Sequence, residues 1–134
     1  MKRIIETDQA PKAIGPYSQA VSSSSHEWIF LSGQIPLDPV TMTVLSDDVE
    51  EQTEQVIRNI SAVLSAAGCA LADVVKTTIF LKDMNDFSRV NSTYEKYFHD
   101  RPPARSTVEV ARLPRDVKIE IEAVAQQSAA TRST

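Results

Sequence analysis

The sequence predicts an α+β domain, a mixed β-sheet with two helices packed on one face. Two segments carry apolar residues at helical spacing, and several others are rich in the β-branched residues that favour strands. In chain order the segments run strands, helix, strand, helix, strands, which is typical of a layered α+β fold. The 134 residues contain no long linker of Pro, Gly or Ser, so we predict one domain over residues 1–126 and a polar, frayed tail over residues 127–134.

The strands are predicted from their β-branched composition. They cover about residues 20–22, 28–35, 74–81, 105–110 and 117–125. The consecutive serines at positions 22–25 are short enough to form a hairpin loop. If residues 113–116 form a two-residue hairpin turn, the last two strands are neighbours and Glu109 lies opposite Glu120, with their polar side chains on one face.

The two helices are predicted from apolar periodicity and end signals. The first begins at Val49, with N-cap oxygens offered by residues 46–48, and stops at Gly68. The second begins with Asp86 as its N-cap and ends before the proline pair at 102–103.

The predicted sheet is apolar on both faces. In one strand Trp28 and Phe30 alternate with Ile29 and Leu31, and the strand over residues 74–81 is likewise apolar on both sides. Two helices cover only one face of such a sheet. We therefore expect the other face to meet a second copy of the chain.

Composition argues against several classes of partner and cofactor. Lys and Arg number 14 against 18 Asp and Glu, a net charge of −4, so neither nucleic acid nor a membrane surface is an expected partner. The sequence shows no secretory leader or spanning apolar stretch, and the single cysteine, Cys69, forms no intrachain disulfide, so a cytoplasmic location is expected. The histidines lie far apart and the common nucleotide and hydrolase motifs are missing, so we expect no metal and no organic cofactor.

An arginine and several carboxylates on the last two strands are candidates for chemistry. Arg105 follows a stiff Pro-Pro-Ala lead-in and could either clamp an anion through two parallel hydrogen bonds or form a surface ion pair. Glu120 and Glu122 could move a proton, although the pattern alone favours a solvated strand face. An arginine and a carboxylate in one pocket would suit a small anionic substrate that also needs proton transfer.

Six motifs span nearly the whole chain, from about residue 4 to residue 125. They are AIGPYSQ (13–19), SGQIP (32–36), VKTT (75–78), VN (90–91), PARS through EVARLP (103–114) and IEIEA (119–123). In this order they strongly resemble the RidA (YjgF) family of reactive-intermediate deaminases. Each motif alone is weak, and their order together makes the resemblance specific.

The resemblance implies a fold, an assembly and an activity. The fold would be the chorismate-mutase-like α+β fold, and the assembly a homotrimer with ligand clefts between neighbouring subunits. The activity would be cofactor-free hydrolysis of 2-imino acids, formed from enamines such as 2-aminoacrylate, to 2-oxo acids and ammonia. Such enamines are released by pyridoxal-phosphate dehydratases and can inactivate other enzymes of that type, so the implied role is protective.

Matching positions imply two catalytic residues. Arg105 would clamp the substrate carboxylate, and Glu120 would hold and activate the attacking water or relay its proton. For Glu120 the resemblance therefore favours a site carboxylate over a solvated strand face.

Further matching positions are implied to bind substrate. Tyr17 would close the pocket and offer a hydroxyl, which is compatible with an interface-packed ring, and Ser32 and Gly33 would line the cleft. Asn91 would contribute an amide, although its place on an apolar helical stripe is otherwise interpreted as a buried amide bonded to the backbone. Thr107 stands where many relatives have cysteine and cannot form a thiolate, so we expect activity to survive with a changed side-chain preference.

A different class of function could use the same cleft. A small-ligand-binding regulatory protein or a chaperone-like protein is the alternative, because a fold does not fix a function. Arg105 and Glu120 together favour the enzyme, since a binding protein needs the arginine and has no need of a water-positioning carboxylate.

Overall fold

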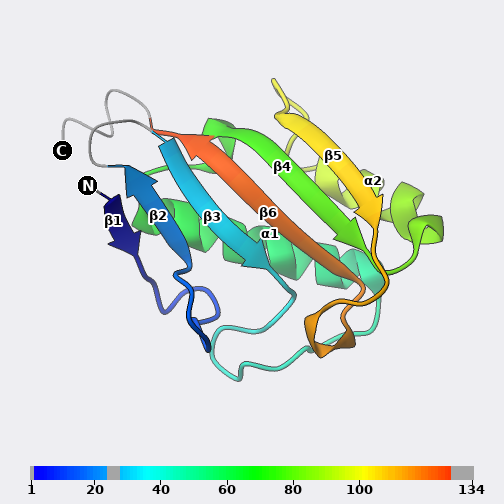
Figure 1. Ribbon diagram of the computed structural model, residues 1–134. Coiled ribbons are helices and arrows are strands. Elements are labelled where there is room, and N and C mark those ends of the chain that lie inside the picture. The colour runs from blue at the N-terminus through cyan, green and yellow to red at the C-terminus, as the bar shows by residue number, and fades with distance from the viewer. Residues whose placement is uncertain (1, 24–27, 128–134) are drawn as a thin grey trace.

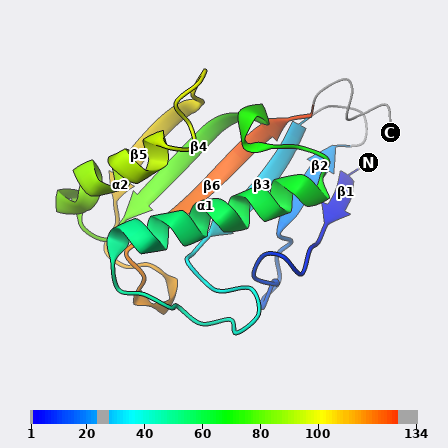
Figure 2. The same cartoon turned by 180° about the vertical axis from the view of Figure 1, so that it is seen from behind.

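The chain folds into a single six-stranded sheet with two helices on one face (Figures 1 and 2). The structure is a computed structural model that describes residues 2–23 and 28–127. Of the predicted serine loop, Ser22 and Ser23 belong to a strand instead, and positions 24–25 lie outside these residues, as does most of the predicted tail. The elements are β1 Lys2–Ile5, β2 Ala20–Ser23, β3 Trp28–Gln34, α1 Val49–Ala66, β4 Val74–Leu81, α2 Phe87–Glu95, β5 Ala104–Glu109 and β6 Ile119–Gln126, with short 3-10 turns at Leu71–Asp73, Met84–Asp86 and Pro114–Asp116.

The predicted strands are confirmed, with bounds shifted by at most two residues, and β1 is an additional strand that was not predicted. The sheet order is β1-β2-β3-β6-β4-β5, in which only the β4–β5 pair is parallel. A mixed sheet is therefore also confirmed.

The expected hairpin between the last two strands is wrong. β4 lies between β5 and β6, so Glu109 is in register with Leu81 of β4, and Glu120 with Phe80. The segment β4-α2-β5 is a strand-helix-strand unit, and a helical crossover returns the chain parallel to the first strand. The 113–116 segment instead holds a 3-10 turn with Arg115 and Asp116 in the left-handed region, at φ 58° and 54°.

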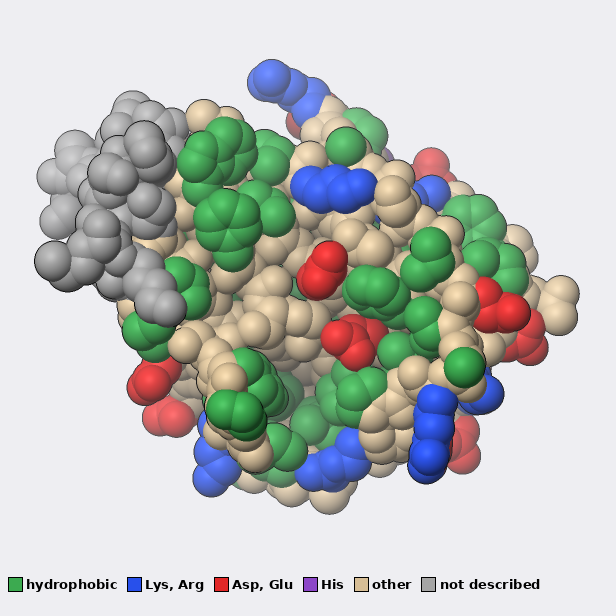
Figure 3. Space-filling view, in the orientation of Figure 1, with side chains coloured by type: hydrophobic (Ala, Val, Ile, Leu, Met, Phe, Trp, Pro, Cys, Tyr) green, Lys and Arg blue, Asp and Glu red, His purple; other side chains and the backbone are tan. Residues whose placement is uncertain are grey.

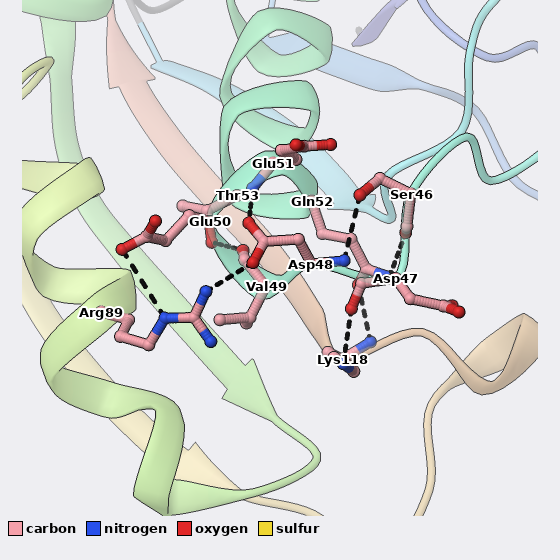
Figure 4. Close-up of polar contacts among 10 residues, drawn as sticks. All are labelled: Ser46, Asp47, Asp48, Val49, Glu50, Glu51, Gln52, Thr53, Arg89 and Lys118. Atoms are coloured by element: carbon pink, nitrogen blue, oxygen red, sulfur yellow. Dashed lines mark hydrogen bonds and ion pairs between the residues drawn. The ribbon is translucent and has the colours of Figure 1, made fainter.

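Helix α1 begins and ends close to where the sequence predicted. The carboxylate of Asp48 accepts a hydrogen bond from the Glu51 amide at 3.0 Å, which confirms a cap within 46–48, and Gly68 follows the helix with φ 78°. Figure 4 shows how this end is tied to other elements: Arg89 of α2 pairs with Asp48 at 2.5 Å, and Lys118 donates to the backbone carbonyl of Asp47. These contacts fix both helices relative to the start of β6.

Helix α2 is shorter than predicted. It ends at Glu95, because the amides of Lys96 and Tyr97 bond to carbonyls three residues back and tighten the last turn. Asp86 is the N-cap residue of α2, as predicted, but its side chain makes no capping hydrogen bond. The carboxylate of Asp83 instead accepts from the amide of Asn85 and begins the 3-10 turn that precedes α2.

The core lies between the helices and one face of the sheet, and the opposite face is open. Ile29 and Leu31 of β3 are buried against the helices, whereas Trp28 and Phe30 on the other side of the strand are 41% and 51% exposed. Figure 3 views this open face and shows acidic side chains near its middle with hydrophobic side chains on either side. The single chain therefore leaves the sheet face uncovered, as the sequence predicted.

Candidate functional site

The carboxylate of Glu120 lies against the backbone of Gly33. A β-carbon built on Gly33 would stand 2.0 Å from Oε2 of Glu120, so only glycine permits this approach. The β3–β6 register shifts between Leu31 and Gln34, which places Ser32 and Gly33 in an irregular stretch of the ladder. The irregular stretch and the missing side chain together leave room for the carboxylate.

Ser32 holds the neighbouring loop against this irregular stretch. Its hydroxyl donates to the carbonyl of Ser18 at 2.5 Å, and its amide donates to the carbonyl of Gln19 at 3.0 Å. Gln19 is itself buried and bonds the backbone on both sides of the loop, to Thr7 and Pro11. The loop that carries Tyr17 is thereby anchored beside Glu120.

A cavity of about 570 Å³ opens at Glu120. The predicted residues Tyr17, Ser32 and Gly33 line it together with Glu120, so the structure brings these four together. Tyr17 is 51% exposed, as expected for a side chain at the mouth of a pocket or at an interface.

Two basic side chains that the sequence did not single out also line this cavity. Lys12 and Arg115 line its wall, so the chain around Glu120 carries positive charge despite the acidic composition. The left-handed turn at residues 115–116 directs Arg115 to this side, where its guanidinium donates to the carbonyl of Met42 at 3.1 Å. No sequence pattern identifies a left-handed turn made by residues other than glycine, so the position of Arg115 at this cavity could not be predicted.

Burial raises the pKa of Glu120, and the nearby charge of Glu122 raises it further. Among the described residues Glu120 has no hydrogen-bond partner, so no donor stabilises its ionised form. A carboxylate with a raised pKa and free lone pairs, in a cavity large enough for water, is a better proton acceptor than an ordinary glutamate.

Arg105 lies elsewhere, beneath α2. Its Nη1 donates to Oδ1 of Asn91 at 2.8 Å, so the interpretation of Asn91 as an amide bonded only to the backbone is wrong. Its guanidinium carbon lies 5.4 Å from the ring centroid of Phe87 and 4.9 Å from that of Tyr94. A second cavity, of about 430 Å³, is lined by Arg105 and Asn91.

Thr107 shares the strand face of Arg105. Its hydroxyl oxygen is buried and has no hydrogen-bond partner among the described residues. A buried hydroxyl without a partner destabilises a fold by about 1–3 kcal/mol, so Thr107 is a costly residue at this position of the described fold.

The two groups of predicted residues face opposite sides of the sheet. Arg105 is in register with Thr77 of β4, and Glu120 with Phe80 of the same strand. Thr77 and Phe80 are an odd number of positions apart, so they and their partners point to opposite faces. One chain therefore carries an acid half, around Glu120 on the open face, and an arginine half, around Arg105 on the helix side.

Two absences apply to the part of the chain that the structure describes. No group of His, Cys, Asp and Glu side chains there is close enough to hold a metal ion. No helix over those residues is long and apolar enough to cross a membrane.

The chain is therefore a small α+β protein with two half-sites. One lies around Arg105 and the other around Glu120, on opposite faces of a single sheet. Comparison with known proteins gives the family. The family model described as Endoribonuclease L-PSP matches residues 7–127, and the chain belongs to this family, also called YjgF/RidA. The predicted resemblance is thereby confirmed.

Relatives cover almost the whole chain. The RutC family protein PH0854 of Pyrococcus horikoshii is 54% identical over 93% of this chain and 98% of its own length. The 2-iminobutanoate/2-iminopropanoate deaminase of Salmonella typhimurium is 53% identical over 93% of this chain and 98% of its own. A crystal structure of Escherichia coli TdcF with bound serine is 45% identical, covers 94% of this chain and 99% of that one, and superposes with a TM-score of 0.88. The predicted α+β fold is that of the family.

Proposed function

We propose that the protein hydrolyses 2-imino acids such as 2-iminopropanoate and 2-iminobutanoate to 2-oxo acids and ammonia. The observation that carries the proposal is Glu120, a carboxylate of raised pKa without a partner among the described residues, lying over Gly33 in an open cavity. Relatives named as deaminases of these imines, at 53% and 52% identity, support the same reaction.

The chemistry needs a base and an anchor. Ionised Glu120 takes a proton from water as the water oxygen attacks the imine carbon, and passes that proton to the imine nitrogen to give a carbinolamine. Glu120 then takes the proton of the carbinolamine hydroxyl and delivers it to the amine nitrogen, so that the carbonyl forms, the carbon–nitrogen bond breaks, and the 2-oxo acid and ammonia leave. Arg105 binds the substrate carboxylate through paired charge-assisted hydrogen bonds, with Asn91 fixing one edge of the guanidinium.

The two halves come together between copies of the chain. Because Arg105 and Glu120 face opposite sides of one sheet, a single subunit does not present both to one small molecule. We propose a homotrimer in which the arginine half of one subunit meets the acid half of its neighbour, and in which the open apolar face with Trp28 and Phe30 is covered. No cofactor takes part in this scheme.

The test is to generate 2-aminoacrylate with a serine or threonine dehydratase and to follow 2-oxo acid release. We expect wild-type protein to accelerate release over the spontaneous rate, and Arg105→Lys and Glu120→Ala to lose the acceleration. Arg58→Lys is the matched control, because Arg58 lies on α1 and bonds only to Gln55 among the described residues. No acceleration by wild type would end the proposal.

A binding role at the same site is the second candidate. The bound serine in Escherichia coli TdcF is the observation that favours it, since serine carries the carboxylate that Arg105 would clamp. A protein that binds serine or 2-oxo acids without accelerating imine hydrolysis would have this role.

Nucleic acid remains outside the proposal, although the family model is described as an endoribonuclease. The net charge of −4 gives no general attraction to a phosphate backbone. The cytoplasmic location expected from the sequence is a separate point and stays a prediction. RNA incubated with the protein under the same conditions is expected to stay intact.

A further inference from the structure

Helix α2 presents a stripe of two rings and an amide to Arg105. Phe87, Asn91 and Tyr94 follow one another at intervals of four and three residues, so they share one side of the helix. All three contact the same guanidinium, at 5.4 Å and 4.9 Å from its carbon to the two ring centroids and at 2.8 Å for the hydrogen bond to Asn91. These three residues do not only pack in the apolar core, because the group that they contact is the positively charged guanidinium of Arg105.

The Tyr94 ring is fixed from two further directions. Its hydroxyl shares a 2.7 Å hydrogen bond with the buried hydroxyl of Thr77, and its ring packs on Phe98 with centroids 4.5 Å apart. Thr77 is the residue of β4 in register with Arg105. Strand pairing, the hydroxyl bond and the ring contact therefore close a loop from Arg105 through Thr77 and Tyr94 back to Arg105.

The charge state of the ring suits this contact. Burial raises the pKa of Tyr94, so its hydroxyl keeps its proton at neutral pH and Arg105 faces a neutral aromatic ring. A guanidinium that packs on aromatic faces can still donate hydrogen bonds from its N–H groups, as the bond from Nη1 to Asn91 shows here.

We propose that Phe87 and Tyr94 are positioning residues for Arg105, and that they hold its guanidinium ready for the substrate carboxylate. The proposal rests on the proposed function and adds residues that neither the motifs nor the predicted site contained. Arginine is long and has many rotamers, so a clamp that is ordered before the substrate arrives binds more tightly than one that is ordered on binding. The rings touch no reacting atom, so they are expected to act on KM rather than on kcat.

The test compares two substitutions at one position. Tyr94→Leu removes the ring, and we expect KM for 2-imino acids to rise about tenfold while kcat stays within about twofold of wild type. Tyr94→Phe keeps the ring and loses only the hydroxyl, and it is expected to recover most of the loss. Tyr97→Leu is the control, because the Tyr97 hydroxyl bonds to Glu54 of α1 and the ring does not contact Arg105.

An NMR signal of Arg105 reports the position of its side chain without an activity assay, and so separates a positioning effect from a loss of folded protein. In wild-type protein the Nε–Hε NMR signal of Arg105, assigned by its absence in Arg105→Lys, should be displaced by the ring currents of Phe87 and Tyr94. We expect Tyr94→Leu to lose much of that displacement and Tyr94→Phe to keep it. Phe87→Leu, at a less buried position, gives the same NMR comparison if Tyr94→Leu does not fold.

Two results would overturn the proposal. One is an unchanged KM and an unchanged Arg105 signal in Tyr94→Leu. The other is Tyr94→Phe as impaired as Tyr94→Leu, which would assign the effect to the hydroxyl and the core. If wild type fails to accelerate imine hydrolysis, the proposed function fails, and the NMR signal together with titration of 2-oxobutanoate still decides whether the rings position Arg105.

Discussion

The β-carbon that Gly33 lacks would lie 2.0 Å from Oε2 of Glu120 and 2.9 Å from its carboxyl carbon. Real β-carbons do not approach other atoms this closely, so any side chain at position 33 must displace the Glu120 carboxylate. The atoms displaced are the end of a flexible side chain, so the fold itself has room to respond.

Gly33→Ala is therefore expected to separate stability from activity. We expect the free energy of unfolding to fall by only about 1 kcal/mol, because Glu120 can change rotamer. We expect kcat/KM for 2-imino acids to fall about a hundredfold, because the base is moved by roughly 1 Å or more. Steady-state kinetics and urea unfolding measure the two effects.

A double-mutant cycle shows whether Gly33 acts through Glu120. In a Glu120→Gln background, adding Gly33→Ala should change kcat/KM little, because the group it displaces is already disabled. Equal losses in both backgrounds would show that Gly33 matters for some other reason.

Glu122→Gln is expected to shift the pH profile of the reaction. The base form of Glu120 is ionised, so kcat/KM should fall as pH drops through its raised pKa. The negative charge of Glu122 disfavours ionisation of Glu120, so its removal lowers that pKa and moves the acid limb to lower pH. Burial is the larger cause and remains, so the limb should stay above the ordinary glutamate value.

The control for this prediction is Glu51→Gln on α1. Glu51 is exposed and far along the chain from the cavity of Glu120, so its removal should leave the limb in place. If the acid limb of the kcat/KM profile does not move in Glu122→Gln, or moves to higher pH, another group sets the pH dependence.

Thr107→Val is expected to stabilise the chain and impair substrate binding. Valine has nearly the same shape and removes a buried hydroxyl that lacks a partner, so the free energy of unfolding should rise by about 1 kcal/mol. If the hydroxyl is left bare for substrate, KM should rise in the same variant. Denaturant unfolding and steady-state kinetics measure these changes.

Thr77→Val is the matched control for that prediction. Its hydroxyl is bonded to Tyr94, so the same substitution leaves a buried phenol without a partner and should lower the free energy of unfolding by about 1–3 kcal/mol. Destabilisation by Thr107→Val with an unchanged KM would contradict the role given to Thr107.

Most elements of the fold were predictable from local sequence. The apolar periodicity of α1 and its ends at Asp48 and Gly68 rest on local chemistry, and β4 is present over the residues predicted from its β-branched run. The short β1 was not predicted, because its four residues, Lys2–Ile5, gain stability from pairing with β2 rather than from their own pattern.

The strand order was not predictable from the turn between the last two strands. The sequence neighbours β5 and β6 suggested a hairpin, and β4 separates them. The strand-helix-strand order of β4, α2 and β5 was the available signal for a parallel pair, since such crossovers place the second strand parallel to the first.

That one error changes the interpretation of the site. A hairpin would have put Arg105 and Glu120 on one face, whereas the observed pairing puts them on opposite faces. The residues around Arg105 were visible in the sequence only as a helical stripe of Phe87, Asn91 and Tyr94, because nothing local shows that a cation from another strand lies against it.

The central claim is that each site takes Arg105 from one subunit and Glu120 from its neighbour. Arg105→Lys and Glu120→Ala proteins, each inactive alone, should be mixed, allowed to exchange subunits and assayed with 2-aminoacrylate generated in place. Statistical exchange pairs an intact Arg105 with an intact Glu120 at one interface in four, so we predict about a quarter of the wild-type activity per site. A mixture as inactive as its two components, after exchange has been verified by mass, would contradict the account.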